Sequence, residues 1–322
     1  MDTTRYDVVI VGGGAAGLSA ATTLGRALRS VLVIDSGTPR NAPAAGVHGY
    51  LSRDGMNPRE LLSVGRSEVL AYGGTVIDGE AGSARRTADG FEVILADSRH
   101  FSGRRLLITT GLTDELPPID GLREQWGKGV VHCPYCHGWE IRGQRIGVLG
   151  TGPLSVHQAL LFRQWSGDIT LFLNDTVDPT DDEWDKLAAR SVRVVEGAVA
   201  SVDEVDGVLS GLTLRQGPSF GLQALAVGPR MEARSALLES LGLRSQPHPS
   251  GAGRFIETDP MGATAVPGVY AGGNVSNLMA QVITAAAEGV MAGARINAGL
   301  IDEETEWATT HRLLRSGRFE GS

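Results

Sequence analysis

Cysteine is scarce in this sequence of 322 residues, which contains only Cys133 and Cys136, three positions apart. A small secreted domain held together by disulfides would carry more cysteines, and they would be spread along the chain. Positive charge is also in deficit, since 29 Lys and Arg face 37 Asp and Glu for a net charge of −8. This balance argues against a nucleic-acid partner, because a general nucleic-acid-binding protein presents a basic face.

Long hydrophobic runs are missing as well. The apolar stretch from Val8 to Ala21 is interrupted by four glycines and is shorter than the ~20 residues that span a bilayer. The N-terminus is too acidic for the basic front of a signal peptide. We therefore expect a cytoplasmic protein with no membrane partner, in a compartment where paired cysteines are usually catalytic or metal-bound.

Glycine, in contrast, is abundant: the 44 glycines are roughly twice the average share of about 7%. Many follow short apolar runs. A β-branched run at 8–11, a glycine turn, a helical stretch to about Leu28 and a second run at 31–34 predict a βαβ unit. The same order recurs between 146 and 172. The sequence thus predicts an α/β fold with two Rossmann-like dinucleotide-binding domains.

Two interruptions mark the domain boundaries. Pro117-Pro118 indicates a linker, and residues 246–253 form a second break rich in Pro, Ser and Gly. We expect a discontinuous first domain, 1–115 plus 254–322. A second domain, 116–253, is inserted in it and carries the cysteine pair.

The first glycine turn matches a dinucleotide-binding fingerprint. Gly12 permits the tight turn, Gly14 lets backbone N–H groups approach a pyrophosphate, and Gly17 allows close packing of helix on strand. Asp35 ends the next strand, where an acidic side chain accepts hydrogen bonds from an adenosine ribose. FAD and NAD both fit this pattern.

The second glycine turn departs from the pattern. Ser155 stands where the third small residue belongs, and Pro153 removes a backbone N–H that would serve a phosphate. Asp175 follows the next strand without any arginine for a 2′-phosphate, so NAD would be preferred over NADP if either bound. A weak or vacant NAD(P)H site is the favoured interpretation.

The cysteine pair lies in the segment Cys-Pro-Tyr-Cys-His-Gly-Trp-Glu. His137 is placed to activate a thiol as a base, whereas His132 is as readily explained as a surface residue. A zinc site would need a second pair of ligands, and His132, His137 and His157 fit no standard spacing, so no metal is predicted. The pair also copies a glutaredoxin motif, but its place between two dinucleotide units argues against that fold.

Taken together, these features resemble the low-molecular-weight thioredoxin reductases nearly end to end. The resemblance implies FAD in the discontinuous domain, NADPH in the inserted domain and a homodimer. It also implies that Cys136 lies nearest the flavin while Cys133 exchanges with substrate. Thr110-Gly111, Gly273-Asn274 and Gln281-Val282 match the family's flavin-contacting segments, with Asn274 in place of an aspartate.

Within that superfamily, the cysteine segment resembles the FAD-dependent dithiol oxidases that form disulfides in gliotoxin, holomycin and romidepsin. Arg40-Asn41 and the segment from His48 to Gly55 resemble that group's flavin-side loop. The catalytic candidates are Cys133, Cys136 and His137. The candidate cofactor-binding residues are Gly12, Gly14, Ala15, Ala16, Gly17, Asp35, Ser36, Arg40, Asn41, His48, Ala81, Thr110, Gly111, Gly273, Asn274, Gln281 and Val282.

Three functional hypotheses follow. The first is a dithiol oxidase that closes a disulfide in a small-molecule dithiol, with oxygen as electron acceptor and hydrogen peroxide as by-product. The second is an NAD(P)H-dependent disulfide reductase acting on a thioredoxin-like protein, with electrons flowing the other way. The third is a flavin-binding redox sensor without turnover. The damaged second turn favours the first hypothesis.

Overall fold

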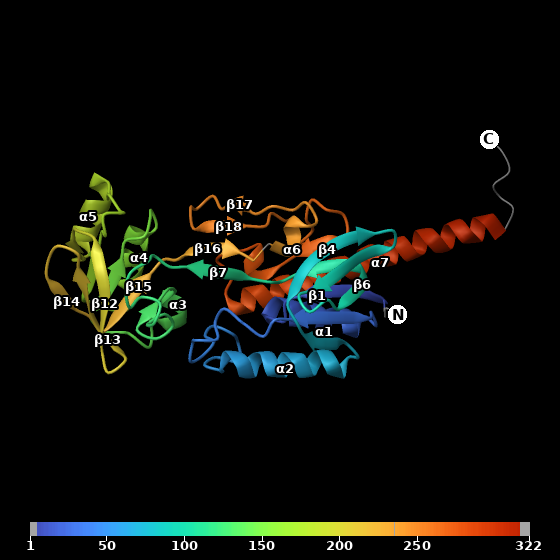
Figure 1. Cartoon of the computed structure of the whole chain (residues 1–322), viewed down its shortest axis with the longest axis horizontal. Coiled ribbons are helices and arrows are strands. Elements are labelled where there is room, and N and C mark those ends of the chain that lie inside the picture. Colours follow the sequence, from blue (N-terminus) through green and yellow to red (C-terminus); the bar gives the residue numbers. More distant parts are fainter. Residues whose placement is uncertain (1–4, 235, 316–322) are drawn as a thin grey trace.

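The computed structural model describes residues 5–234 and 236–315; the first four and last seven residues of the predicted first domain lie outside this part. The chain forms two α/β units joined by a small sheet (Figure 1). The predicted fold class is confirmed, since each unit carries a parallel βαβ arrangement and one unit is inserted in the other.

A seven-stranded sheet forms the first unit, in the order β3-β2-β1-β6-β5-β4 with β19 paired to β6. Its strands are β1 (Arg5–Val11), β2 (Val31–Asp35), β3 (Thr75–Asp78), β4 (Ala81–Thr87), β5 (Gly90–Leu95), β6 (His100–Ile108) and β19 (Val269–Ala271). Pairing is parallel from β3 through β6 and on to β19, and antiparallel among β4, β5 and β6. Val8 to Val11 are all buried, which explains their β-branched run without polar alternation.

The helices of this unit are α1 (Ala15–Arg26), α2 (Pro58–Ala71), α6 (Ala236–Glu239) and α7 (Val282–Arg315), with a short 3₁₀ turn, η1 (Gly273–Val275). Helices α1 and α7 pack backbone to backbone, because a Cβ on Gly289 would lie only 2.0 Å from the carbonyl oxygen of Ala16. This close contact holds η1 and the start of α7 beside the start of α1.

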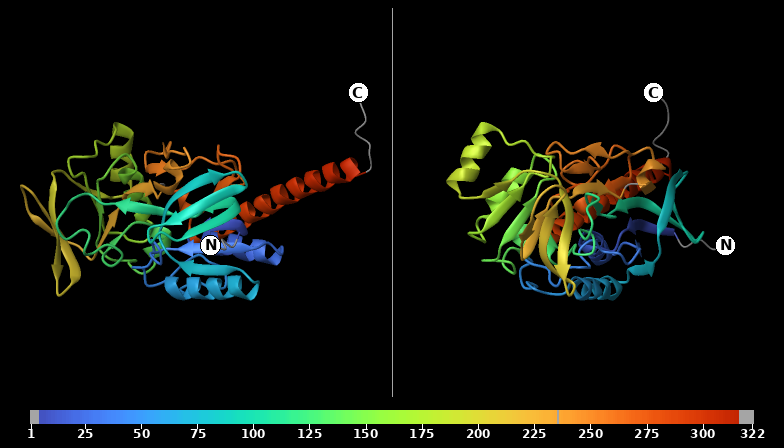
Figure 2. Two further views of the ribbon diagram at one scale, coloured as in Figure 1. Left: turned by 45° about the vertical axis from the view of Figure 1, so that its right-hand side comes forward. Right: turned by 60° about the vertical axis from the view of Figure 1, so that its left-hand side comes forward.

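Helix α7 continues to Arg315 and projects away from the body (Figures 1 and 2). Charge pairing accounts for part of the extension. Glu304 pairs with Arg29 at 2.6 Å and also with Arg104, so the charged tail is tied to the first unit.

The inserted unit contains a five-stranded parallel sheet in the order β11-β10-β9-β15-β8 and an antiparallel sheet β12-β13-β14. The bounds are β8 (Val130–Val131), α3 (Pro134–His137), β9 (Ile146–Leu149), α4 (Ser155–Phe162), β10 (Ile169–Phe172), α5 (Asp181–Ala189), β11 (Arg193–Val195), β12 (Val199–Val205), β13 (Val208–Leu214), β14 (Ser219–Gly221) and β15 (Ala224–Val227).

The chain crosses between the units twice, on neighbouring strands. β7 (Leu112–Glu115) and β16 (Arg230–Ala233) run antiparallel, and β18 (Gly253–Phe255) and β17 (Gln246–Pro247) extend their sheet. Leu237 and Leu238, which follow β16, are buried in the core of the first unit. The inserted domain therefore ends before β16, earlier than the sequence-based boundary at 253, because the Pro/Ser/Gly stretch is the turn between β17 and β18.

Across the described residues, none of the helices combines the length and the apolar character needed to cross a bilayer.

Candidate active site

The three glycines of the first turn have different structural roles. Gly12 has φ +108°, and a Cβ there would lie 2.3 Å from the carbonyl oxygen of Thr109. A Cβ on Gly17 would lie 1.9 Å from the carbonyl oxygen of Gly12. Backbone atoms therefore leave no room for a side chain at Gly12 or Gly17. Gly14 precedes α1, and no atom lies within 4 Å of its Cβ position. The open approach to the N-terminus of α1 therefore lies at Gly14.

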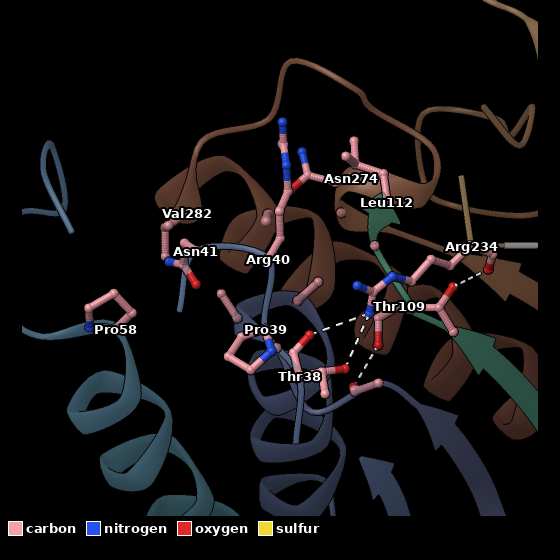
Figure 3. A pocket seen from close by; sticks show the side chains of 18 of the residues that line it. Thr38, Pro39, Arg40, Asn41, Pro58, Thr109, Leu112, Arg234, Asn274 and Val282 are labelled. Atoms are coloured by element: carbon pink, nitrogen blue, oxygen red, sulfur yellow. Dashed lines mark hydrogen bonds between the residues drawn. The ribbon is translucent and has the colours of Figure 1, made fainter. Parts of the chain in front are cut away.

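This approach opens into a cavity of about 990 Å³. The cavity collects residues from β1, β2, η1, α7 and the cysteine segment, and Figure 3 shows Arg40, Asn274 and Val282 around the same hollow. Of the predicted site residues, Gly17 alone is outside the lining and supports the turn from behind. The lining contains Gly12, Gly14, Ala15, Ala16, Asp35, Ser36, Arg40, Asn41, His48, Ala81, Thr110, Gly111, Cys133, Cys136, His137, Gly273, Asn274, Gln281 and Val282.

Asp35 is fixed at the end of β2 by two contacts. Its Oδ1 accepts a hydrogen bond from the backbone N–H of Gly13 at 3.1 Å, and its Oδ2 pairs with Arg66 of α2 at 2.7 Å. Gly13 has to be glycine here, because a Cβ would lie 2.6 Å from the Asp35 carboxyl carbon. The carboxylate is thus held rigidly at the place where such folds bind a ribose.

Asn274 is oriented by its own loop. Its Nδ2 donates hydrogen bonds to the carbonyl oxygens of Asn277 at 3.1 Å and Ala280 at 2.9 Å. Gly273 is anchored in turn, because its N–H donates to Glu288 of α7 at 2.8 Å. An aspartate could not donate to these carbonyls, so the amide is the side chain that this loop requires.

We therefore expect Asn274→Asp to be harmful even though the resembling family carries aspartate here. A carboxylate would face two carbonyl oxygens without a proton to donate, at a cost of about 1–3 kcal/mol. Thermal unfolding and flavin content of the purified protein measure the effect. Asn277→Asp is no substitute control, since Asn277 also contacts Glu288; Gln246→Glu, which converts an exposed amide to an acid, is the matched one. Unchanged stability and flavin content in Asn274→Asp would contradict this interpretation.

The cysteine pair lies at the start of α3, which begins at Pro134. Cys133 precedes the helix in extended conformation, and the backbone N–H of Cys136 donates to the carbonyl oxygen of Cys133 at 3.2 Å. A hydrogen bond from the Cys136 thiol lowers the pKa of Cys133 to about 7, assisted by the backbone N–H groups of Cys136 and Tyr135 and by the positive charge of Arg40. The same thiol contact and burial raise the pKa of Cys136. In the dithiol state, Cys133 is therefore the thiolate.

Alkylation of the reduced enzyme tests this assignment. Because the pKa of Cys133 is lowered from 9.0 to about 7, we expect carbamidomethylation at Cys133 to reach half its maximal rate near pH 7. Mass spectrometry of peptides from enzyme that was reduced and desalted without oxygen gives the rate at each thiol. Faster labelling of Cys136, or a midpoint at the value of an ordinary thiol, would refute it.

His137 is the last residue of α3 and shares the cavity with both thiols. Burial lowers the pKa of His137 below its ordinary value of 6.5, and the charge of Glu140 opposes this shift. At neutral pH the imidazole is therefore uncharged and able to accept a proton. Among the described residues, its Nδ1 is buried without a hydrogen-bond partner.

His132 lines the cavity, so its interpretation as a surface histidine is wrong. Burial, with the nearby positive charge of Arg40, lowers the pKa of His132 to about 4. Arg40 forms a bidentate ion pair with Asp114 of β7, in which Nε donates to Oδ2 at 2.7 Å and Nη2 donates to Oδ1 at 2.6 Å. This pair places a fixed positive charge beside the cysteine segment.

Comparison with known proteins adds four findings. Residues 6–289 match the family model described as pyridine nucleotide-disulphide oxidoreductase. Thioredoxin reductase tcpT from Claviceps purpurea is 32% identical over 306 residues, which cover 89% of this chain and 92% of tcpT. The crystal structure of HlmI superimposes with a TM-score of 0.90 at 43% identity, covering 98% of both chains. An oxidoreductase from Agrobacterium tumefaciens superimposes with a TM-score of 0.87 at 36% identity, covering 92% of this chain and 99% of the other.

The chain is a pyridine nucleotide-disulphide oxidoreductase. It is an oxidoreductase of the thioredoxin reductase-like type, which confirms the resemblance read from the sequence. Thioredoxin reductase-like members of this family bind FAD. The first glycine turn and the cysteine pair open into one cavity, so this oxidoreductase brings a dinucleotide-type turn and a thiol pair together.

The second glycine turn of this pyridine nucleotide-disulphide oxidoreductase differs from the first in its backbone donors. The Ser155 hydroxyl accepts hydrogen bonds from the N–H groups of Thr151 at 3.0 Å and Gly152 at 3.3 Å. Asn174, at positive φ, donates to the carbonyl oxygen of Gly150 at 3.1 Å. The space beside Gly152 is open, as it is beside Gly14, but two donors of the turn are engaged by Ser155, which adds to the loss of a donor at Pro153.

Several residues of the site were missed by sequence reasoning. Asp114 orients Arg40, Arg66 holds Asp35, and Glu288 anchors Gly273. Thr109 supports the first turn through a hydrogen bond of 2.8 Å to the carbonyl oxygen of Gly12. Of these residues, only Thr109 lies next to a recognised motif, the Thr-Gly pair. The others contact partners that are far away in the sequence, so no short motif contains both residues.

Proposed function

We propose that this oxidoreductase is an FAD-dependent dithiol oxidase, which closes a disulfide in a small-molecule dithiol and passes the electrons to oxygen. The observation that carries the proposal is the shared cavity: Cys133, Cys136 and His137 line the same space as the open turn at Gly14. The second turn supports it, because Ser155 engages two of its backbone donors and an oxidase that uses oxygen has no need of NAD(P)H. The sequence resemblance to dithiol oxidases supplies the substrate class.

The residues present fit FAD. The N–H groups at the start of α1 have no side-chain cap and no acidic residue in the first turn, so they are free to receive a pyrophosphate. Asp35 would hold the adenosine ribose, while Asn274, Gln281 and Val282 would hold the flavin half. When bound, FAD would take the electron pair from the cysteine dithiol and deliver it to oxygen, giving hydrogen peroxide.

The chain's own residues account for the thiol chemistry. A substrate thiolate attacks Sγ of Cys133 in the Cys133–Cys136 disulfide, and Cys136 leaves as a thiolate. The second substrate thiol loses its proton to neutral His137 and attacks the mixed disulfide. Cys133 then leaves as a thiolate. The substrate is now a disulfide, the two electrons are on the thiolates of Cys133 and Cys136, and the proton of the second substrate thiol is on His137.

Anaerobic mixing of the flavin-loaded enzyme tests the proposal. Dithiothreitol and dihydrolipoamide should bleach the visible flavin absorbance, whereas NADH and NADPH should leave it oxidised over the same time. Oxygen admitted afterwards should restore the absorbance and yield one hydrogen peroxide for each disulfide formed. Rapid bleaching by NADPH together with no response to dithiols would instead establish the reductase direction, which the names of the thioredoxin reductase relatives favour.

The proposal has two further parts. The enzyme is expected to work in the cytoplasm, and the resemblance implies a homodimer. Sedimentation of the flavin-loaded protein measures its mass in solution, and a monomer at micromolar concentration would remove the homodimer from the proposal.

A further inference from the structure

The proton that His137 accepts must be passed on to another group or to water. Nδ1 of His137 is buried without a hydrogen-bond partner in the described part of the chain. Three acidic residues line the cavity. Asp35 and Asp114 are each held by an arginine, and exposed Glu80 follows β3 beside the Asp35 end of the cavity. A base that takes a proton from its substrate must lose that proton before the next turnover.

Glu140 is the nearest acidic group that acts on His137. It follows His137 by three residues in the turn after α3, and its negative charge raises the pKa of His137 against the effect of burial. Its side chain is 47% exposed, so the carboxylate is in contact with solvent. Glu140 thus lies between the buried base and bulk water.

His48 meets Glu140 from the other domain. Its Nε2 lies 3.6 Å from Oε1 of Glu140, and its Nδ1 lies 3.5 Å from Oδ2 of Asp54. Both distances are longer than hydrogen bonds but lie within the range of ion pairs. The loop holds this position, since the N–H of Gly49 donates to Oδ1 of Asp54 at 2.9 Å. The two acids face His48 from opposite ring nitrogens.

We propose that Glu140 and His48 carry the proton that His137 takes from the dithiol across the domain boundary to solvent. His137 gives its proton to the Glu140 carboxylate, Glu140 gives it to the imidazole of His48, and His48 releases it to water beside exposed Asp54. One proton enters and one leaves in each cycle, and every group returns to its starting state. The inference rests on the proposed function, because only dithiol oxidation charges His137 in this direction.

Glu140 and His48 are therefore positioning residues that act through His137. The titratable groups that face His137 are Glu140, His48 and His132, and those that face His48 are Asp54, Glu140 and His137. In Glu140→Gln the charge that raises the pKa of His137 is lost. The acid limb of the pH profile should then move to lower pH, while proton release on the plateau becomes slower.

Steady-state oxidation of dithiothreitol in air, followed by the formation of hydrogen peroxide, measures both effects across the range in which histidine titrates, because His137 must lose its proton between turnovers. We expect the plateau rate of Glu140→Gln to fall by about tenfold, part of the ~10²–10⁴-fold that a general base contributes. Added imidazole or acetate should restore much of it, and Glu140→Asp should stay close to the wild type. His48→Gln should lower the plateau in the same way. Glu124→Gln, an exposed carboxylate of the same domain, is the matched control.

An NMR titration of His137 in the flavin-free protein gives a second readout, which should also move to lower pH in Glu140→Gln. Superimposable pH profiles and an unmoved His137 titration in this variant would overturn the relay while leaving dithiol oxidation intact. A wild-type flavin that no dithiol reduces would overturn the proposed function itself and the relay with it. A shifted profile with rescue by small acids or bases is the result that supports the relay.

Discussion

Cys136→Ser is expected to abolish reduction of the flavin by dithiols, lowering the anaerobic rate by on the order of 10³-fold or more. Serine cannot form the Cys133–Cys136 disulfide, so the substrate thiolate has no S–S bond to attack. Cys133→Ser should have the same effect for the same reason. Because the two sulfurs act as one unit, the double variant should lose no more than either single variant.

Flavin content and reduction rate must be measured on the same preparations. The serine variants should keep the flavin, because neither cysteine is needed to hold the turn at Gly14 or the ion pair at Asp35. Tyr135→Phe, between the two cysteines and 62% exposed, is the control and should reduce its flavin at nearly the wild-type rate. A Cys136→Ser enzyme that still bleaches rapidly would show that the thiols do not lie on the electron path.

Local patterns predict the fold class and the cavity lining well, because each pattern describes a short continuous segment. The run Val8–Val11 reads as a doubly buried strand, and all four residues are buried. The first glycine turn, the Thr-Gly pair, the Gly-Asn pair and the start of α7 are likewise continuous. The parallel sheet then brings these segments to one edge, where they meet around the cavity.

The parts that the sequence does not predict depend on pairing between distant residues. Arg66 and Asp35 are 31 residues apart, and Arg40 and Asp114 are 74 apart. Neither spacing follows from a helix or strand period, so no pattern marks the partners. The domain boundary at 253 fails for the same reason: a turn between two short strands and a true linker have the same Pro/Ser/Gly composition.

The two glycine turns illustrate how similar local sequences reach different chemistry. At the first turn, the N–H groups at the start of α1 have no side-chain partner, and the space beside Gly14 is open. At the second turn, the space beside Gly152 is also open, but the hydroxyl of Ser155 occupies the donors of Thr151 and Gly152. The two turns thus differ in the donors left for an anion, which agrees with an enzyme that takes electrons from a dithiol.

The glycines of the first turn provide the sharpest separation between folding and cofactor binding. Gly17→Ala should destabilise the protein even without FAD, because its Cβ would lie 1.9 Å from the carbonyl oxygen of Gly12 and 2.6 Å from the Thr109 hydroxyl. Overpacking of this kind costs about 1–3 kcal/mol. The melting temperature of the flavin-free protein should fall by about 2–4 °C for each kcal/mol.

Gly14→Ala should behave in the opposite way. Its backbone, with φ −77° and ψ −174°, suits alanine, and its Cβ would meet no atom within 4 Å. The flavin-free variant should therefore melt within a few degrees of the wild type, yet it should be purified almost without flavin because the methyl group fills the space that a pyrophosphate needs. Full flavin content in Gly14→Ala would mean that the phosphates do not approach there. An equally stable Gly17→Ala apoprotein would mean that the turn can move away from the helix, and the rigid cradle inferred for the cofactor would then be absent.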